Sequence, residues 1–382
     1  MQKKHFVLPK IYCLIFVFAA LAASGCFPTV QHEEYITIGA LFPLTGSSSD
    51  AGHRAINGLH LAVEEINADG GILGKKLDVI VLNDKGDEEE IVRQYGILKE
   101  KKVIAVIGSN YSNMTLALAK AAEADGIPII SPTASHPEIT QGRKNVFRAI
   151  FLDDHQAEVM AEFAYHTLNT KTVVAFRNTA DDGFGHLTEV FAKTFEDFGG
   201  KMTAVEPYDS DDDFAEMLEK YRTAPPDAFY CPDDFIPASK LVNTVYEMGL
   251  GNIPLLGSDA WDGLLIYAVN TDAMNNVYFP APFAIDDDDP IVARFVKDFY
   301  TAFSQTPLTD SANTYTCVYI LAEAVKKAGS TNAEDIIAAM KTNELHTVIG
   351  RIKFDENNNP NSNVYVTQIK GGVYSTYKKI ER

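Results

Sequence analysis

Several polar side chains follow apolar runs at points where β-strands are expected to end. Asp259 follows "IPLLGS", and Ser112 lies within "SNYSN", which follows "VIAVIG". A hydroxyl and free backbone amides at a helix start suit an anion such as a carboxylate, whereas an aspartate suits a cation. Each residue also has an ordinary explanation, because serine often caps helices and exposed aspartates are common. These residue types indicate a site that recognises charge, and the spacing alone leaves both explanations open.

Two further loops carry candidate contact residues. Thr133 and Ser135 follow "GIPIISP" and offer hydroxyls and backbone carbonyls, unless the segment is a plain turn. Phe184 lies between two glycines in "DDGFGH", a context typical both of a stacking wall and of a core side chain. Trp261 is the only tryptophan, and we expect it beside a cleft or hinge because it follows Asp259 so closely.

Motifs of catalysis and metal binding are missing from the sequence. No G-x-S-x-G nucleophile motif occurs, and "DGGILGKK" and "DDGFGHLT" fail the phosphate-loop and dinucleotide patterns. The acidic runs "DSDDDF" and "DDDDP" lack the spacing of a calcium loop, so they are read as helix starts and solvated faces. We therefore expect no enzyme activity, no cofactor and no metal.

The elements that would position these residues alternate between strand and helix. Expected strands at 35–44, 75–84, 103–108 and 126–132 are separated by segments with helical spacing, and the same rhythm resumes after residue 150. Continuously apolar strands that alternate with helices predict parallel sheets covered on both faces. The fold class is therefore α/β, with two Rossmann-like lobes of similar size.

The C-terminal third departs from this rhythm. Asp289 and Pro290 mark a helix start, and we expect helices over 290–303, about 312–328 and after Ser330. The segment from 350 to the end predicts short antiparallel strands.

The N-terminus and the overall charge constrain location and partners. Residues 1–25 have a basic start, a 13-residue apolar run and the ending "ASGC", which predicts a signal peptide of the lipoprotein type with Cys26 lipidated. The formal charge is −19, which disfavours nucleic acid as a partner. Cys231 and Cys317 fall in different expected lobes, so we expect both to be buried and unpaired.

Long stretches of the sequence resemble one protein family. "GALFPLTGSSSDAGHRAINGLHLAVEEINADGGILGKKLDVIVLND", "GIPIISPTASHPEIT", "DDGFGHLTEVFAKTFEDFGG", "LGSDAWDG" and "TVIGRIKFDENNNP" occur in the order typical of leucine/isoleucine/valine-binding proteins. These are the substrate-binding subunits of branched-chain amino acid ABC transporters, with the type I periplasmic binding protein fold. The resemblance covers residues 35 to 375. It implies a ligand cleft between two lobes joined by a three-strand hinge, with 35–152 plus 282–347 in the first lobe and 153–281 plus 348–382 in the second.

The resemblance also implies roles for particular residues. Ser112 and Ser135 would hold the carboxylate of an amino acid, and the Thr133 carbonyl and Asp259 would meet its ammonium group. Phe184 would stack on the ligand from the second lobe. The physics agrees, because a zwitterion in a closed cleft loses hydration at both ends unless each charge is met.

The sequence departs from the family in the loops that would contact the ligand side chain. The first-lobe loop that contains Asp50 and Ala51 is small and polar, where the family often has an aromatic residue. Asp233 and Asp234 stand where aromatics can occur, and the positions of the frequent first-lobe disulfide are Gly86 and Tyr111. These departures count against leucine, isoleucine or valine as the ligand and are compatible with a larger, polar or cationic amino acid.

The expected function is capture of an amino acid by lobe closure and its delivery to a membrane ABC permease. The expected protein is an exported monomer, in the periplasm or on the outer face of the cell membrane. One alternative is a ligand-sensing domain, which we disfavour because no segment beyond the lobes reads as a spanning helix or output module. Another is a ligand such as an amide, urea or a small carboxylate, against which Asp259 argues.

Overall fold

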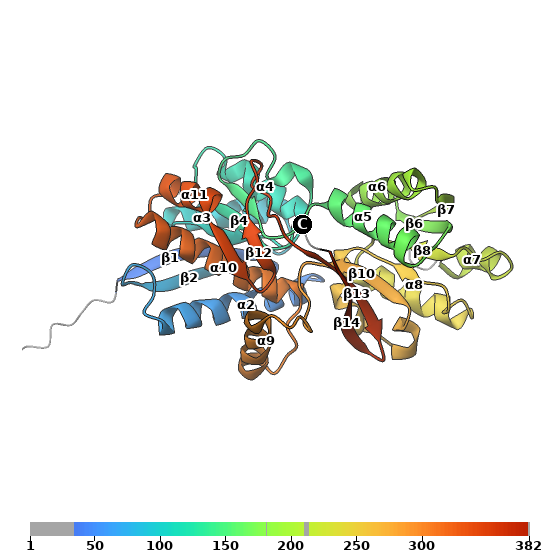
Figure 1. Ribbon diagram of the computed structural model, residues 1–382. Helices are drawn as coiled ribbons and strands as arrows, with labels where there is room; N and C mark the ends of the chain where they lie inside the picture. Colours follow the sequence, from blue (N-terminus) through green and yellow to red (C-terminus); the bar gives the residue numbers. More distant parts are fainter. Residues whose placement is uncertain (1–33, 181, 210–213, 381–382) are drawn as a thin grey trace, which may run out of the picture. The chain divides into compact units, whose positions relative to one another are not determined.

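The computed structural model describes residues 34–180, 182–209 and 214–380. Residues from Tyr35 on form one compact unit, which we describe by itself. It contains a five-stranded and a seven-stranded β-sheet, each with apolar clusters under helices on both faces, and a small two-stranded sheet (Figure 1). The expected signal segment 1–25 and Cys26 lie outside the described residues.

The first sheet is entirely parallel, with the strand order β2-β1-β3-β4-β5. Its strands are β1 (Tyr35–Phe42), β2 (Lys76–Asn83), β3 (Val106–Gly108), β4 (Ile129–Ser131) and β5 (Val146–Arg148). The three central strands β1, β3 and β4 are almost wholly buried, which explains their continuous apolar sequences.

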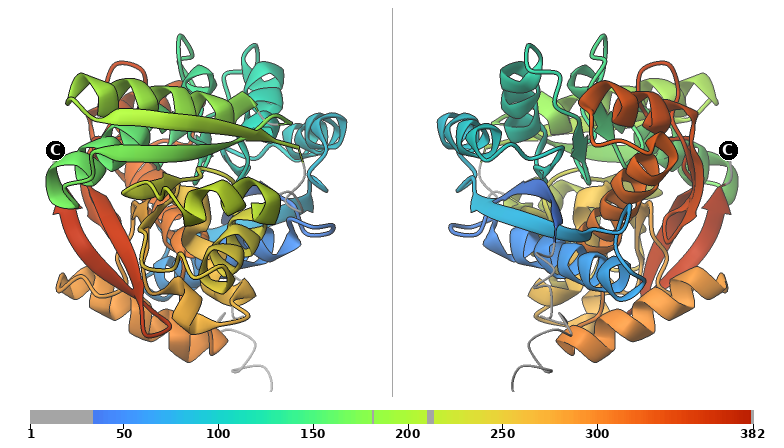
Figure 2. Two further views of the ribbon diagram at one scale, coloured as in Figure 1. Left: turned by 90° about the vertical axis from the view of Figure 1, so that its right-hand side faces the viewer. Right: turned by 90° about the vertical axis from the view of Figure 1, so that its left-hand side faces the viewer.

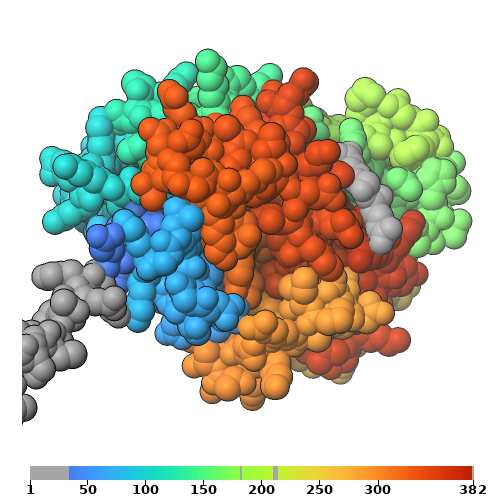
Figure 3. Space-filling model, turned by 60° about the vertical axis from the view of Figure 1, so that its left-hand side comes forward, coloured from blue at the N-terminus to red at the C-terminus, as the bar shows by residue number. Residues whose placement is uncertain are grey.

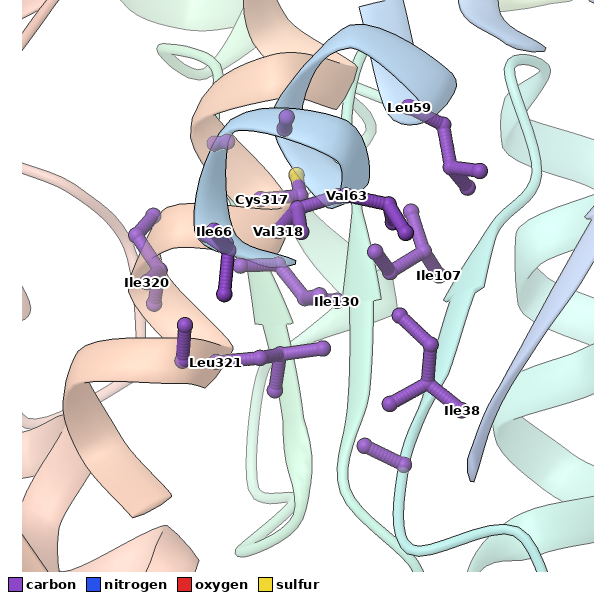
Figure 4. Close-up of a cluster of buried hydrophobic side chains, with 14 of the residues drawn as sticks. Ile38, Leu59, Val63, Ile66, Ile107, Ile130, Cys317, Val318, Ile320 and Leu321 are labelled. Atoms are coloured by element: carbon purple, nitrogen blue, oxygen red, sulfur yellow. The ribbon is translucent and has the colours of Figure 1, made fainter. Parts of the chain in front are cut away.

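Helices from both ends of the sequence cover the first sheet. One face carries α2 (Ser49–Ala68), α9 (Pro290–Phe303), α10 (Thr309–Ala328) and α11 (Ala333–Thr342). The other face carries α3 (Glu88–Glu100) and α4 (Ser112–Ala122). Figure 4 shows Val63 of α2 beside Val318 of α10, above the strand residues Ile107 and Ile130, with Leu59 further along α2. On the surface in Figure 3, blue N-terminal segments lie beside the orange C-terminal helices.

The packing of α2 on α10 depends on a glycine. A Cβ on Gly58 would lie 2.1 Å from the carbonyl oxygen of Ser311, so only glycine permits this approach. The contact matters for function because it positions the N-terminal end of α10, where Thr309 lines the cavity described below.

The second sheet has the strand order β14-β13-β10-β9-β8-β6-β7. Its strands are β6 (Thr172–Asn178), β7 (Lys201–Tyr208), β8 (Ala228–Tyr230), β9 (Leu255–Leu256), β10 (Val277–Ala281), β13 (Val364–Lys370) and β14 (Val373–Ile380). The strands β6 to β10 are parallel, whereas β13 and β14 add an antiparallel edge (Figure 2). The parallel lobes and the antiparallel tail predicted from the sequence are both confirmed.

The helices of the second lobe also lie on both faces of their sheet. Those packed on one face are α5 (Asp153–Glu162), the π-helix Phe163–Thr167 and α6 (Asp182–Asp197). Those on the other are α7 (Phe214–Glu219), α8 (Phe235–Glu247) and the 3-10 helices η5 (Asp259–Tyr267) and η6 (Thr271–Met274). Short 3-10 turns also occur at Pro137–Ile139 and Lys220–Arg222.

From the sheet order and the apolar clusters we infer that the chain passes between the two lobes three times: after β5, after β10 and before β13. The hairpin of β11 (Glu344–Thr347) and β12 (Gly350–Lys353) belongs to the first lobe, because Ile352 and Phe354 pack in the core under α10. We therefore place the last boundary between Phe354 and Val364, some residues after the expected position at 347–348.

Both described cysteines are free and fully buried, as predicted. Cys317 lies in the core of the first lobe, and Cys231 lies in the core of the second. Among the described residues, no helix combines the length and the apolar character that crossing a membrane requires.

Candidate functional site

A cavity of about 380 Å³ lies at the carboxyl ends of the strands and is lined by both lobes. Ligands of open α/β sheets bind at this edge. The first lobe contributes Ala51, Arg54, Asn110, Tyr111, Ser112, Asn113, Leu116, Thr133, Ser135, His136, Leu308, Thr309 and Asp310. The second lobe contributes Asp153, Gly183, Phe184, Leu187, Asp234, Phe235, Asp259, Ala260, Asp262 and Gly263.

Six of the eight predicted ligand-binding residues line this cavity. They are Ala51, Ser112, Thr133, Ser135, Phe184 and Asp259. The other two, Asp50 and Asp233, do not line it.

Asp233 is turned into the second lobe. It is only 3% exposed, and its carboxylate accepts hydrogen bonds from Asn178 Nδ2 at 2.9 Å and from the Tyr208 hydroxyl. These partners hold it below the cavity floor, and the next residue, Asp234, lines the cavity in its place. Of these two adjacent acids, the structure therefore brings Asp234 to the cavity and not the predicted Asp233.

Asp50 is exposed on the first turn of α2, where the Tyr267 hydroxyl donates to it at 3.3 Å from the second lobe. Its neighbour Ala51 faces the cavity. The expectation for Trp261 was wrong, because its side chain is fully buried in the second-lobe core. The indole lies against Gly257, where an added Cβ would come within 2.0 Å of the ring. Gly257 therefore makes room for the ring beneath the turn that carries Asp259.

The start of α4 forms one end of the cavity. Tyr111 is the N-cap and makes no side-chain capping bond, so the first N–H groups of the helix lack the usual partner. Ser112 is the first helical residue, and its Oγ accepts from His136 N at 3.4 Å rather than capping the helix. This end of the cavity suits an anion because a hydroxyl stands beside the positive end of a helix dipole.

The loop after β4 is held in place by a buried arginine. Arg148 is fully buried and donates to the carbonyls of Ala134 at 3.1 Å and His136 at 2.7 Å. Burial lowers the pKa of Arg148 to about 10, so the guanidinium stays protonated near neutral pH. Thr133 donates through Oγ1 to the Asn110 carbonyl at 2.9 Å, which links this loop to the one before α4.

Two carboxylates lie close together at the second-lobe end. The Gln156 side-chain amide donates to Asp259 Oδ1 at 2.8 Å and to Asp153 Oδ1 at 2.9 Å. Gln156 Oε1 also accepts from the Asp259 backbone N at 2.9 Å. Because one nitrogen reaches both acids, their bonded oxygens lie within about 6 Å of each other. The Ser135 side chain lies on the same side of the cavity and acts to lower the pKa of Asp153.

The pKa values of these acids reflect the crowding. Burial, followed by the negative charge of Asp153, raises the pKa of Asp259 to about 7. Burial raises the pKa of Asp153 as well, although Ser135, Gln156 and Arg148 oppose the rise. A ligand ammonium group between the two carboxylates would stabilise their charged forms.

A second polar cluster, at the start of α10, was missed by the sequence reasoning. Arg54 on α2 donates through Nε and Nη2 to Asp310 Oδ2 at 3.0 and 2.8 Å, and Asn110 Nδ2 donates to Asp310 Oδ1 at 2.5 Å. Asp262 comes from the second lobe, and its Oδ2 accepts from the backbone N of Thr309 at 2.5 Å. The two lobes are thus directly hydrogen-bonded beside the cavity.

The sequence signals for this cluster were weak. The helix at α10 was expected from about residue 312, but it begins at Thr309, so Asp310 falls in its first turn. Arg54 lies in a segment whose apolar residues at helical spacing predict a helix, and this pattern gives no sign that its one arginine faces a site. Asp262 is the second acid of "LGSDAWDG", three residues after Asp259, and this repeat of an acid is its only sequence signal.

Apolar side chains complete the cavity walls. Phe184 of α6 and Phe235 of α8 come from the second lobe, together with Leu187, and Leu116 comes from α4. Phe235 is stacked on Tyr267 with ring centroids 5.1 Å apart, which restrains its ring at the wall. The cavity therefore combines apolar walls with a few charged groups, as small-molecule sites do.

The charges of the cavity are strongly unequal. Five acids line it, Asp153, Asp234, Asp259, Asp262 and Asp310, against one guanidinium. No group of three or more His, Cys, Asp or Glu side chains in the described part of the chain is arranged to hold a metal ion. Two lobes that enclose a charged, apolar-walled cavity at their strand ends define a binding protein that closes around a small solute.

Comparison with known proteins identifies the family. Residues 35–373 match the family model described as "Periplasmic binding protein". The chain belongs to this family, which confirms the resemblance noted from the sequence.

Curated relatives match over most of their length. The Leu/Ile/Val-binding protein BraC3 of Rhizobium johnstonii is 28% identical over 351 residues, which cover 88% of this chain and 92% of the relative. The leucine-, isoleucine-, valine-, threonine- and alanine-binding protein of Pseudomonas aeruginosa is 28% identical, with 89% and 91% covered.

Solved structures agree with the fold. The branched-chain amino acid transporter substrate-binding protein LivJ of Streptococcus pneumoniae, in complex with isoleucine, has a TM-score of 0.82 at 28% identity. The match covers 91% of this chain and all of that one. The leucine-binding protein LivK of Thermotoga maritima has a TM-score of 0.81 at 27% identity, with 91% and 99% covered.

Proposed function

We propose that the protein captures an amino acid between its lobes and delivers it to an ABC transporter permease. The observation that carries the proposal is the pair Asp153 and Asp259, which Gln156 holds on one side of the cavity. The uncapped start of α4 with Ser112 also lines this cavity, from the first lobe. An α-ammonium group fits the acid pair, and an α-carboxylate fits the helix start.

The two partners of the zwitterion come from different lobes, so the ligand favours the closed arrangement. A ligand that binds one conformation better shifts the population toward it by its difference in affinity. The hydrogen bond from Thr309 N to Asp262 also stabilises the closed arrangement, and it does not involve the α-amino or α-carboxyl group of the ligand.

The transport role is supported by the family and by relatives whose names describe amino acid binding. We propose that the protein is exported, anchored by a lipid on Cys26, and acts as a monomer with a membrane permease as its partner. The proposal involves no cofactor and no catalytic step.

The test is a ligand screen by thermal shift, followed by calorimetry. Any ligand that binds only the native state raises the melting temperature, and at 1,000 times its Kd it adds about 4 kcal/mol of stability. Each amino acid that scores is compared with its α-hydroxy acid and its α-amide. We expect both analogues to bind at least about 100-fold more weakly, because each leaves one charged end of the cavity without its partner. Equal binding of the α-hydroxy acid would show that the acid pair does not hold an ammonium group.

A further inference from the structure

The cluster at the start of α10 has more negative charge than its single cation can balance. It brings together Arg54, Asp234, Asp262 and Asp310 at the cavity wall. The guanidinium of Arg54 forms its hydrogen bonds with Asp310, on two nitrogens, and also lies near Asp262. Three carboxylates therefore share one positive charge, and Asp234 makes no ion pair among the described residues.

Unpartnered hydrogen-bond acceptors face the same region. Asn110 is 94% buried, and its Nδ2 donates to Asp310, which fixes the orientation of the amide. Its Oδ1 then has no partner in the described structure, and neither does the buried Oδ1 of Asp234. Both residues line the cavity. Buried acceptors without donors are costly, so this end of the cavity lacks N–H or O–H groups that a ligand would supply.

We propose that this end of the cavity binds the cationic group of a basic amino acid side chain, an ammonium or a guanidinium, through Asp234, Asp262 and the Asn110 Oδ1. The inference rests on the proposed function, because it places the α-amino and α-carboxyl groups at the other ends of the same cavity. It extends that function from amino acids in general to those with a positively charged side chain.

Other side chains fit this cluster less well. An aliphatic side chain would remove water from Asp234 and Asp262 and offer no charge in return, which is unfavourable for buried carboxylates. An acidic side chain would need a free cation, but Arg54 is already bound to Asp310 and the cluster remains net negative. A guanidinium or ammonium group supplies several N–H donors and one positive charge.

Matched ligand pairs give the cleanest test. Arginine and citrulline differ by a guanidinium and a neutral urea group of the same shape, and lysine and norleucine differ by the terminal ammonium. We expect calorimetry at pH 7.5 and low salt to show that arginine or lysine binds at least about 100-fold more tightly than its neutral counterpart. Norleucine or citrulline binding as tightly as the basic partner would overturn the inference.

The outcomes separate this inference from the proposed function. If neutral amino acids bind tightly and basic ones do not, the amino acid function stands and the basic side chain is refuted. If no α-amino acid binds at all, both fail. The wild-type ligand ratios do not depend on any variant folding correctly.

An isosteric variant tests the residue assignment. We expect Asp234→Asn to reduce the preference for lysine over norleucine by about tenfold or more, because it removes one charge and keeps the shape. Asp272→Asn is the matched control, since Asp272 is an exposed acid in the same lobe and does not line the cavity. A preference unchanged in Asp234→Asn, or equally reduced in Asp272→Asn, would overturn the role of Asp234.

Discussion

The variant Asp259→Asn should weaken ligand binding and stabilise the ligand-free protein. In the ligand-free cavity the charged carboxylate of Asp259 is unfavourable, since burial and Asp153 raise its pKa to about 7. With an amino acid bound, the same charge becomes the partner of the ammonium group. Asparagine keeps the shape, and its Oδ1 can still accept the hydrogen bond from Gln156.

The loss of ligand affinity and the gain in stability both come from removing the charge of Asp259, but their magnitudes differ. Removing one partner of a buried charge pair costs about 2–5 kcal/mol, which corresponds to a Kd about 30- to 5,000-fold higher. In the ligand-free protein, a rise of the pKa from 3.8 to about 7 corresponds to at most about 4 kcal/mol at pH 8. Because Asp259 is only partly buried, solvent screening reduces this figure, and we expect about 2 kcal/mol of stabilisation.

The sign of the pH dependence follows from the raised pKa. An acid whose pKa is higher in the folded state contributes stability that is fully present below the unfolded value, near 4, and is lost as pH rises through about 7. Wild type should therefore approach the stability of Asp259→Asn on acidification from pH 8 to pH 4. Above pH 7 the variant should be the more stable protein.

The assay combines calorimetric binding with urea unfolding of both proteins at pH 5 and pH 8, with Asp272→Asn as the control. An Asp259→Asn protein that loses both affinity and stability at pH 8 would refute the reasoning, because Asp259 would then have a purely structural role. An unchanged Kd would refute its assignment to the ammonium group.

Three further predictions concern the pH dependence of binding, the packing of α2 and the contact between lobes. A bound ammonium group lowers the pKa of Asp259 from about 7, so ligand affinity should rise up to tenfold per pH unit between pH 5 and 7, and binding should release protons. Calorimetry in buffers of different ionisation enthalpy measures the affinity and the proton release. An affinity that does not change with pH would contradict the assignment. Gly58→Ala should lower the free energy of unfolding in urea by about 2–3 kcal/mol, because the added Cβ would clash with the backbone of α10. The control Gly96→Ala on α3, where a Cβ would meet open space, should be neutral or up to about 1 kcal/mol stabilising. Similar costs for both variants would show that helix packing is not the cause. Asp262→Ala should lower ligand affinity about tenfold and give a more expanded solution-scattering profile, because it removes the hydrogen bond from Thr309 of the other lobe. An unchanged scattering profile together with unchanged affinity would rule out a role of Asp262 in holding the lobes together.

Much of the fold could be predicted because its signals are local. Apolar runs alternating with helical spacing define parallel sheets, and the carboxyl ends of parallel strands meet at one edge. Ser112, Phe184 and Asp259 each follow a strand, so the sequence pattern brings all three to the cavity. The predicted start of α9 at Pro290 is confirmed for a similar local reason, since Asp289 caps it through its side chain.

The rest of the site depends on residues that no local pattern connects. Asp310 lies at the start of a helix 200 residues after Asn110, and their hydrogen bond requires α10 to be placed beside α2, where Gly58 permits close packing. Gln156 reaches Asp259 across 103 residues for a comparable reason. Neither contact leaves a signal in residue spacing.

The sequence by itself determined the α/β lobes, their order and the strand ends that carry the charged groups, because hydrophobic periodicity and turn chemistry act over a few residues. Only the tertiary structure decided which acid of an adjacent pair faces the cavity, as with Asp233 and Asp234. It also decided which charges are already balanced, as with Arg54 and Asp310. Charge balance and side-chain direction depend on partners brought together from distant parts of the chain, and the selectivity of the cavity depends on both.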